Sequence, residues 1–455
     1  MSQAVLSQAL AKAKDTREVV IESGALVQTD DVLSRCFGDL PVGLVADENT
    51  FAAAGESLLQ HLQSAGRRVL KTHVFPGKPR LHPDIEYVEH LVDVLRDNDL
   101  VPIAVGSGVI NDLTKLAAQR LGRPYAVVGT AASMDGYTAF AAAITHHGVK
   151  KVDPCPAPRA LIADLDIIAA APRGMSAAGF GDLLGKYSAL ADWRIAQELG
   201  IEPIEPISWG LMEQGLPGWT GNPEGVRSGD REALRGLVEG LVIAGLAMQI
   251  ASSTRAASGS EHLFSHLWEM QGLTHNGENV PHGIQVGLGT IASSALLEWL
   301  LSLDLTRLPL DAISQAWPTA EQVEAEVRSA HPAGPQADQA VAETLAKHLS
   351  VAQLRSRIER VGQAWPDLSQ WLRGWSLTPR AAQQRLDRVG CPTDPRAIGL
   401  DFDRLAQSYR LARQVRKRYT VLDLALESGR LPAALEAIFS GGGYWGERAS
   451  QPFPV

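Results

Sequence analysis

Two histidines one helical turn apart are the residues of this sequence best suited to bind a metal ion. His262 and His266 are four residues apart in GSEHLFSHLWEM, so on a helix both imidazoles project from one face. His282 follows in VPHGIQVGLGT, near the start of the next predicted helix. Asp182 opens an amphipathic helix in apolar surroundings, where an unpaired carboxylate is unfavourable. One aspartate and two or three histidines form an open ligand set of the catalytic type.

The histidine spacing also has a plainer interpretation. Pairs of histidines at this spacing occur on helix surfaces and in cores without any metal. His275 lies between the pair and His282 and is a competing ligand. The spacing alone therefore leaves the metal site open.

A glycine-containing turn is the candidate phosphate-binding feature. The segment VPIAVGSGVINDLTKLA predicts a buried strand, a tight turn and then a helix. Glycines let backbone N–H groups approach a phosphate closely, and the helix N-terminus adds partial positive charge. A tight turn also needs glycine for purely conformational reasons, so both interpretations stand. The turn residues are Gly106, Ser107 and Gly108.

Two acidic residues are candidates for contacts to a nucleotide cofactor. Asp47 ends a predicted strand directly before a helix that begins near Thr50. A carboxylate there accepts hydrogen bonds from an adenosine ribose and repels a 2′-phosphate, which favours NAD over NADP. The same aspartate suits an N-terminal helix cap, and the sequence does not decide between the two. Asp112, in the helix after the glycine turn, is the other candidate.

A third segment with polar groups follows the predicted strand Tyr125–Val128. Loops at the carboxyl ends of parallel strands face the ligand crevice. In GTAASMDGYTAF this loop carries Thr130, Ser133 and Asp135. The alternative is a turn stabilised by its own serine and aspartate side chains.

The elements that must position these residues divide the chain into two halves. Short β-branched runs alternate with helical patterns in the first half, which predicts a parallel α/β sheet. Amphipathic patterns rich in Ala, Leu, Glu and Arg continue from about residue 170 to Ile438. We therefore predict an α/β nucleotide-binding domain over 1–168 and an all-helical metal- and substrate-binding domain over 169–455. The predicted strands are Val19–Glu22, Val42–Ala46, Val69–Val74, Val101–Val105, Tyr125–Val128 and Ala160–Ala163. The predicted helices of the first half are Phe51–Ala65, Asp84–Asp97 and Val109–Leu121.

Composition excludes several classes of protein. The 455 residues carry a net charge of −9 without a long basic tract, which argues against a nucleic-acid binder. Three widely spaced cysteines fit neither a disulfide framework nor a thiolate metal site, and we expect a cytoplasmic protein. The apolar segment Gly236–Ala251 contains Glu239 and Gln249, so we expect a buried core helix and no membrane insertion.

Taken in order, these segments resemble the glycerol-1-phosphate dehydrogenase family, most closely its bacterial branch associated with arabinose operons. The superfamily also holds dehydroquinate synthase, glycerol dehydrogenase and iron-containing alcohol dehydrogenases. The resemblance covers most of the chain, although the glycine turn has serine where relatives often have a third glycine. The matching segments are GLVADENT, AVGSGVINDLTK, GTAASMDGYTA, ALIADLDIIAAAP, AAGFGDLLGKYSALADW, SGSEHLFSHLWEM, PHGIQVGLGT and RKRYTVLDLALESG.

The resemblance implies a dehydroquinate synthase-like fold, with a Rossmann-like domain, a helical domain and an active site in the cleft between them. It implies metal ligation by Asp182, His262 and His282. It also implies that His266 lines the site and that Asp135 contacts the substrate near the metal. The dinucleotide contacts implied are Gly106, Ser107, Gly108, Thr130 and Ser133.

The activity implied is the interconversion of dihydroxyacetone phosphate and sn-glycerol 1-phosphate with NAD(H), or with NADP(H). The divalent ion expected is nickel or zinc, with iron less favoured, and the assembly expected is a homodimer. Basic residues that are candidates for the substrate phosphate are Lys150, Lys151 and Lys186. Three alternatives remain: a dehydrogenase of an unphosphorylated polyol, a dehydroquinate synthase-like cyclase, and a non-catalytic sensor. The cyclases typically have glutamate where this chain has Asp182.

Overall fold

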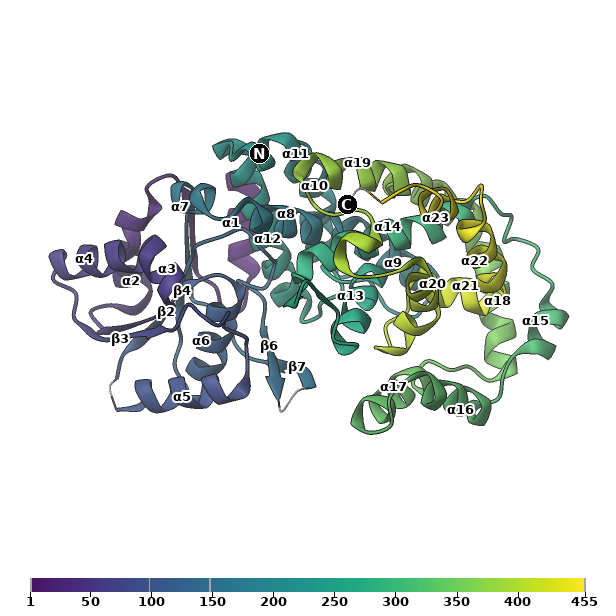
Figure 1. Cartoon of the computed structure of the whole chain (residues 1–455), viewed down its shortest axis with the longest axis horizontal. Helices are drawn as coiled ribbons and strands as arrows, with labels where there is room; N and C mark the ends of the chain where they lie inside the picture. Colours follow the sequence, from purple (N-terminus) through teal and green to yellow (C-terminus); the bar gives the residue numbers. More distant parts are fainter. Residues whose placement is uncertain (1, 98, 147–148, 454–455) are drawn as a thin grey trace. The chain divides into compact units, whose positions relative to one another are not determined.

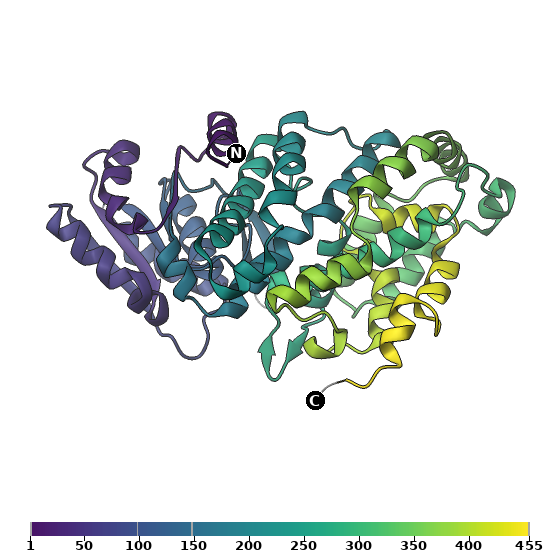
Figure 2. The ribbon, with the colours of Figure 1, turned by 90° about the horizontal axis from the view of Figure 1, so that it is seen from above.

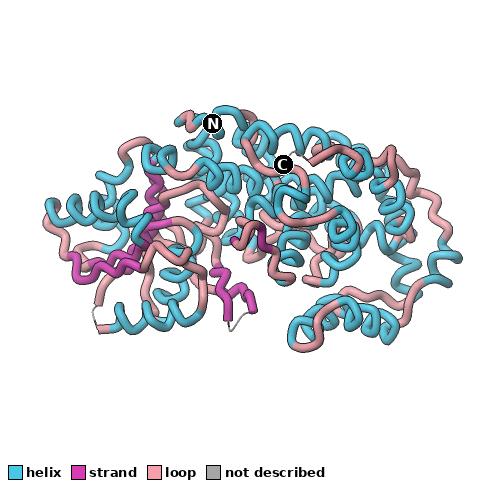
Figure 3. The backbone as a smooth tube through the Cα atoms, viewed as in Figure 1, coloured by secondary structure: helices cyan, strands magenta, loops and turns pink. Residues whose placement is uncertain are grey.

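The first half of the chain forms a six-stranded parallel sheet (Figures 1 and 3). The computed structural model describes residues 2–97, 99–146 and 149–453. All six predicted strands are present, each within a residue or so of its expected bounds. Across the sheet the strand order is β1 (Glu18–Glu22), β8 (Ala160–Asp164), β5 (Ala126–Gly129), β4 (Val101–Gly106), β2 (Val42–Asp47) and β3 (Val69–Phe75).

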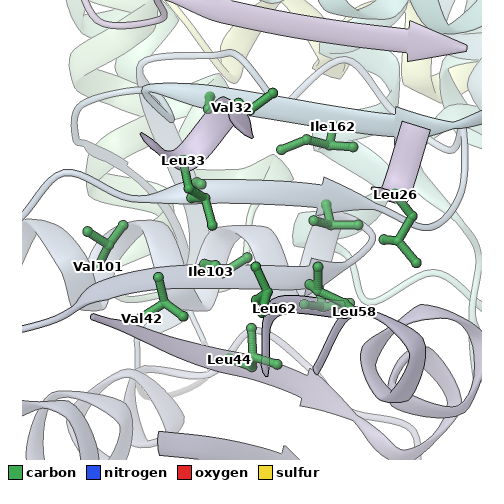
Figure 4. Close-up of a cluster of buried hydrophobic side chains, with 14 of the residues drawn as sticks. Leu26, Val32, Leu33, Val42, Leu44, Leu58, Leu62, Val101, Ile103 and Ile162 are labelled. Atoms are coloured by element: carbon green, nitrogen blue, oxygen red, sulfur yellow. The ribbon is translucent and has the colours of Figure 1, made fainter. Parts of the chain in front are cut away.

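One face of the sheet is covered by a continuous apolar cluster (Figure 4). Helices α2 (Thr29–Phe37) and α4 (Glu56–Ser64) supply its outer layer. Alternate residues of the central strands supply the inner layer, as expected for side chains that point to opposite faces of a strand. Each fully buried Leu, Ile or Val contributes roughly 1.5–3 kcal/mol. The labelled members are Leu26, Val32, Leu33, Val42, Leu44, Leu58, Leu62, Val101, Ile103 and Ile162.

Helices α5 (Ile85–Arg96) and α6 (Gly108–Arg120) pack on each other, and α6 packs on β4 directly after the glycine turn. The third predicted helix is also present, as α3 (Glu48–Thr50), a π-helical turn (Phe51–Gly55) and α4. A hairpin outside the main sheet, β6 (Ala141–His146) with β7 (Val149–Pro154), was not predicted. The sequence carries only a weak signal for it, because the first strand, AAAITH, is half alanine and the second, VKKVDP, has two β-branched residues.

The rest of the described chain is almost entirely helical, and Figure 2 shows its green-to-yellow part as helices and loops. The one exception is a hairpin of two-residue strands, β9 (Thr274–His275) and β10 (Glu278–Asn279), which the sequence also did not predict. The helices from residue 165 on are α7 (Leu165–Ala170), α8 (Arg173–Leu184), α9 (Lys186–Glu198), α10 (Pro206–Trp219), α11 (Pro223–Ser228), α12 (Arg231–Ala251), α13 (Ser260–Met270), α14 (His282–Leu301), α15 (Leu310–Ala316), α16 (Ala320–Ala330), α17 (Pro335–Leu345), α18 (Val351–Trp375), α19 (Pro379–Val389), α20 (Phe402–Leu411), α21 (Val421–Glu427), α22 (Leu431–Phe439) and α23 (Tyr444–Ala449).

By their contacts the residues form two compact units, each made of separate stretches of chain. The first unit comprises 1–183, 206–257 and 388–390, and the second comprises 184–205, 258–387 and 391–455. The domain boundary expected at 168/169 coincides with none of the changes of unit along the chain, because α8, α10 and α12 group with the sheet. That boundary stays a prediction.

Within the described part of the chain, two helices, α12 and α14, are long and apolar enough to cross a membrane by composition. In α12, 83% of the most apolar window is buried inside the protein, and in α14 it is 89%. Both are therefore core helices, as expected for the segment Gly236–Ala251.

Candidate metal and nucleotide site

The three imidazoles of the predicted ligand set come together in the second unit. His262 and His266 lie one turn apart on α13, and His282 is the first residue of α14. The ring centroids of His262 and His282 are 5.2 Å apart, and those of His266 and His282 are 5.8 Å apart with the rings stacked. The two helices approach closely at Gly289, where an added Cβ would overlap the backbone of Glu261.

Carboxylates hold the rings in place through their Nδ1 atoms. His262 Nδ1 lies 2.8 Å from Glu261 Oε1, and His282 Nδ1 lies 3.1 Å from Glu269 Oε1. His282 Nδ1 is also 3.1 Å from the Ser265 hydroxyl. This carboxylate–imidazole pattern fixes the orientation of metal-ligating histidines and makes Nε2 the ligand atom.

The acid of the predicted set, Asp182, lies on α8 and is fully buried. Its Oδ2 accepts a hydrogen bond of 3.0 Å from the backbone N–H of Asp135, in the loop after β5. One turn earlier on α8, a Cβ added to Gly179 would overlap the carbonyl oxygen of Ala132 in the same loop. The loop therefore packs directly on the face of α8 that carries Asp182.

The ligand atoms of Asp182, His262 and His282 all lie within 4.8 Å of one another. Asp182 stands near the point where α8 carries the chain from the first unit into the second, at residue 183/184. Burial lowers the pKa of His262 well below its usual value, and the charge of Lys186 lowers it further. A buried, neutral His262, a partly exposed His282 and one buried carboxylate form a donor set that suits a divalent ion, so these residues fit a metal ion.

The other two candidate histidines lie outside this group of ligand atoms. His266 Nδ1 is 3.3 Å from Glu269 Oε2, and burial lowers the His266 pKa to about 4. His275 lies on β9, in the small hairpin, and is not part of the group. Glu261, beside His262, has its pKa raised to about 8 by burial and by the charge of Asp192.

The glycine turn has the geometry of a strand-to-helix turn at the carboxyl edge of the sheet. Ser107 occupies the N-cap position of α6, but its side chain makes no capping hydrogen bond. A Cβ on Gly106 would lie 2.6 Å from the Cβ of Ile110, so glycine is required there by packing. Thr130 donates its N–H to Gly106 O at 3.1 Å, which sets the loop after β5 beside the turn. The first N–H groups of α6 therefore lie beside the switch point between β2 and β4, from which the chain continues to β3 and to β5 in opposite directions along the sheet.

Asp47 does form the helix cap that was one of its two interpretations. Its Oδ1 accepts the Thr50 N–H at 2.8 Å, and the Asp47 N–H donates to Thr50 Oγ1 at 3.0 Å. Strand β2, which Asp47 ends, is the neighbour of β4 in the sheet. The ribose contact stays a prediction.

Asp112 lies on α6 and binds the β6–β7 hairpin. Its Oδ2 accepts from the Ala143 N–H at 3.1 Å, and its Oδ1 accepts from Asn111 Nδ2 at 3.1 Å. These contacts tie α6 to β6, and a contact of Asp112 with the cofactor stays a prediction.

Lys115 is a positioning residue that sequence reasoning missed. Its ammonium group is buried and donates to three backbone carbonyls, Gly136 O at 2.8 Å, Ala139 O at 2.9 Å and Ala141 O at 3.0 Å. A signal was present in the sequence, because this lysine falls among the apolar positions of the helix after the glycine turn. Lys115 fixes the end of the loop that carries Asp135.

Helix α12 holds the same loop from another side. Thr138 Oγ1 donates to Val242 O at 2.7 Å, and Gln249 Nε2 donates to Thr138 O at 2.7 Å. Thr130 is buried, whereas Ser133 and Asp135 are partly exposed. The loop is therefore a rigid segment supported by α6, α8 and α12, and not merely a turn stabilised by its own side chains.

The lysines considered for phosphate binding do not all belong to one unit. Lys186 opens α9, is fully buried, and has a polar partner. Lys151 is exposed on β7 in the first unit. The side chain of Lys150 lies outside the described residues.

Comparison with known proteins places this architecture among dehydrogenases. Residues 20–172 match the family model "Iron-containing alcohol dehydrogenase". Maleylacetate reductase from Rhizobium sp. strain MTP-10005 has the same fold, with a TM-score of 0.60 and 17% identity over 93% of this chain and 97% of that one.

Two curated relatives are described as glycerol-1-phosphate dehydrogenase. The protein from Halalkalibacterium halodurans is 38% identical over 57% of this chain, and the match spans 65% of that relative's length. The protein from Pyrococcus furiosus is 36% identical over 62% of this chain, and that match spans 78% of the relative. The chain therefore belongs to the NAD(P)-dependent glycerol-1-phosphate dehydrogenase family, within the iron-containing alcohol dehydrogenase superfamily.

Proposed function

We propose that this protein is a metal-dependent oxidoreductase that interconverts dihydroxyacetone phosphate and sn-glycerol 1-phosphate with NAD(H). The observation that carries the proposal is the grouping of Asp182, His262 and His282, whose ligand atoms lie within 4.8 Å of one another. The family relationship supports the reaction, and the glycine turn supports the use of a dinucleotide.

Asp182, His262 and His282 hold the divalent ion in this proposal. When bound, such an ion supplies a Lewis acid that polarises a carbonyl oxygen. The chain's own contribution is to keep the His262 imidazole neutral by burial and to orient both imidazoles through Glu261 and Glu269. Imidazole and carboxylate ligands suit nickel and zinc, and we propose one of these two.

The first unit binds the cofactor in this proposal. The N–H groups at the start of α6 bind the pyrophosphate, because the turn of Gly106, Ser107 and Gly108 allows close approach. NADH supplies the hydride that reduces the ketone. Thr130 and Ser133, in the loop beside the turn, also line this site.

Asp47 sets the preference for NADH in this proposal. Its Oδ1 is engaged by the cap, and its carboxylate charge disfavours the 2′-phosphate of NADPH. Replacing Asp47 with asparagine would then weaken the preference for NADH, so that the kcat/KM with NADH exceeds that with NADPH by a smaller factor.

Two residues near the reacting groups have proposed roles in handling substrate and proton. Asp135 contacts the substrate from the loop that packs on α8, where its own backbone N–H already binds Asp182. His266, whose ring stacks on that of His282, passes the proton between substrate and solvent. We further propose that the protein is a cytoplasmic homodimer, in keeping with its three unpaired cysteines.

The decisive experiment is a spectrophotometric assay of the metal-free protein with Ni²⁺ or Zn²⁺ added back. Oxidation of NADH should require both the metal and dihydroxyacetone phosphate. His262→Ala should lower turnover by more than about 100-fold and also abolish stoichiometric metal in elemental analysis. Absence of NADH oxidation with dihydroxyacetone phosphate under every metal would overturn the proposal. If glycerol or dihydroxyacetone gave the higher kcat/KM, a dehydrogenase of unphosphorylated polyols would replace it.

A further inference from the structure

A basic segment that follows α20 lies along the histidine-bearing helix. The short 3₁₀ turn η4 (Ala412–Gln414) packs against α13. A few residues later, Arg418 Nη1 donates to the carbonyl oxygen of Ser258, just before α13 begins. The chain between these two points therefore runs beside the helix that carries His262 and His266.

Three residues of this segment, Arg413, Gln414 and Lys417, hold it in place through contacts with other parts of the chain. Arg413 Nε is 3.2 Å from Asp423 Oδ1, and Gln414 Oε1 is 2.8 Å from His331 Nε2. The backbone N–H of Lys417 donates to Glu343 Oε2 at 2.6 Å. The residue between them is held in place by its neighbours and not by its own side chain.

That residue is Arg416, and its guanidinium has no protein partner among the described residues. It has no hydrogen bond to any residue that the structure describes, and no described carboxylate oxygen lies within 4.0 Å of it. Its side chain is only partly exposed, and burial lowers its pKa while the charges of Glu343 and Glu269 raise it. Its charge also acts on His266. A partly exposed guanidinium without a described protein partner can bind an anion.

The other basic side chains of the segment either have a protein partner or face solvent. Arg413 pairs with Asp423, and Arg418 binds a backbone carbonyl before α13. The side chain of Lys417 is exposed to solvent. Arg416 therefore differs from its neighbours in being partly buried and in having no hydrogen-bond or ion-pair partner among the described residues beside the imidazole cluster.

We propose that Arg416 binds the phosphate group of the substrate and is the residue that selects a phosphate monoester over a free polyol. This inference rests on the proposed function and adds the residue that recognises the phosphate group of the substrate. A guanidinium presents a planar fork of donors that matches two phosphate oxygens, which an ammonium group cannot do. A dianionic phosphate also supplies a direct ion-pair partner, since no described carboxylate oxygen lies within 4.0 Å of Arg416.

A structural role predicts a different set of effects. If Arg416 only balanced the charge of Glu269, its loss would disturb the histidines that Glu269 orients. Metal content would then fall, and turnover of every substrate would fall with it. A phosphate contact instead predicts a loss confined to phosphorylated substrates.

The test compares dihydroxyacetone phosphate with dihydroxyacetone in the metal-loaded enzyme, using Arg416→Ala, Arg416→Lys and the adjacent control Lys417→Ala. For Arg416→Ala we expect kcat/KM for the phosphorylated ketone to fall roughly 10- to 100-fold, mainly through KM. We expect the value for dihydroxyacetone to stay within about threefold. Arg416→Lys should lie between the wild type and Arg416→Ala, and Lys417→Ala should match the wild type.

A binding measurement gives a readout independent of turnover. Titration calorimetry with inorganic phosphate should detect binding to the wild type and to Lys417→Ala, and weaker binding to Arg416→Ala. Elemental analysis and thermal unfolding of each variant report the metal content and the folded state. If Arg416→Ala does not fold, Arg416→Lys carries the comparison in its place.

The outcomes separate the two proposals. A wild type that reduces dihydroxyacetone phosphate, with Arg416 variants that keep its preference over dihydroxyacetone, would overturn the phosphate contact alone. Equal losses on both substrates, accompanied by lost metal, would also overturn it and assign Arg416 to charge balance. A wild type inactive on the phosphorylated ketone would overturn the proposed function itself.

Discussion

The two regions that supply the proposed metal ligands are positioned by different physical means. On the aspartate side, α8 meets the loop after β5 through glycine contacts and backbone hydrogen bonds, with Gly179 against Ala132 and Asp182 bound to the Asp135 N–H. On the histidine side, α13 and α14 are also close-packed, but the rings are oriented by carboxylates. The position of Asp182 therefore depends mainly on close packing, and the orientation of the histidine rings depends mainly on charged groups.

This difference teaches where the protein is sensitive to its environment. Contacts set by shape respond to changes of volume, because interiors are close-packed and adapt little. Contacts set by ionisable groups respond to pH and to loss of one partner, because the remaining charge is left uncompensated. The following predictions test this division, from the largest expected effect to the smallest.

Lys115→Met should have the largest effect on stability. The substitution keeps the aliphatic stem but leaves three backbone carbonyls of the loop without their donor. We expect a loss of about 3–5 kcal/mol in the free energy of unfolding, measured by urea denaturation. The exposed residue Lys12 offers a control, since Lys12→Met should change it by less than about 0.5 kcal/mol. A loss as small as the control's would show that the loop does not depend on Lys115.

Gly179→Ala tests the shape-based contact directly. The added methyl group overlaps the Ala132 carbonyl, so α8 or the loop must shift, at about 1–3 kcal/mol. Gly174→Ala is a matched control on the same helix, because nothing lies within 4 Å of a Cβ there. The control should stabilise by about 0.5–1 kcal/mol through helix propensity. If thermal unfolding shifted equally for both variants, the glycine contact would have no role.

Glu269→Gln tests the charge-based contact. The amide keeps the volume but removes the negative charge that faces His266 and His282. We expect metal affinity to fall about 10- to 100-fold, measured by competition with a chelator. Glu436→Gln, on an exposed position of α22, should leave the affinity unchanged. Unaltered affinity in Glu269→Gln would mean that the rings are held by packing, as on the other side.

A pH effect should come from a buried ionic cluster elsewhere in the second unit. Burial raises the pKa of Glu427 to about 7, from 4.5. The folded chain therefore binds more protons than the unfolded chain between these values, and the free energy of unfolding should fall as pH rises through that window. The charged or titratable groups around Glu427 are Arg357, Arg413, Tyr419, Asp423 and, through Asp423, Lys347.

Urea denaturation of Glu427→Gln between pH 4.5 and 7.5 checks this effect. The variant should show a smaller fall over the window than the wild type, because its side chain does not titrate. The pKa of Lys347 is lowered to about 8, so its own contribution lies above the window. Parallel curves for wild type and variant would exclude Glu427 as the source.

The strands and the ligand histidines could be predicted because their signals are local. Each central strand is a short, fully buried β-branched run, and the spacing of His262 and His266 alone places them on one helix face. Asp182 was singled out as a carboxylate in apolar surroundings, and the family resemblance then implied its role as a ligand. The β6–β7 hairpin was missed because its alanine-rich first strand has weak β propensity.

The supporting residues could not be predicted, because their partners are distant in sequence. Lys115 binds carbonyls 21 to 26 residues away, so its partners do not follow from the helix pattern, although its place among apolar positions indicates burial. Arg416 stands in a run of three basic residues, RKR, which by itself predicts only a solvated surface. Arg416 differs from the basic residues around it only because the structure shows partners for Arg413 and Arg418 and an exposed side chain for Lys417.

The interrupted chain course of the two units has a consequence for synthesis. A ribosome completes all six strands of the sheet by residue 164, yet the helices that finish that unit continue to residue 257. Until α12 emerges, the loop that bears Asp135 lacks the Thr138 and Gln249 contacts. Some 90 further residues, about 5 to 20 seconds of translation, must therefore be synthesised before the nascent sheet gains its contacts with α12. A chaperone that shields apolar strands should bind ribosome-stalled chains ending near residue 170 more strongly than chains extended well beyond residue 257.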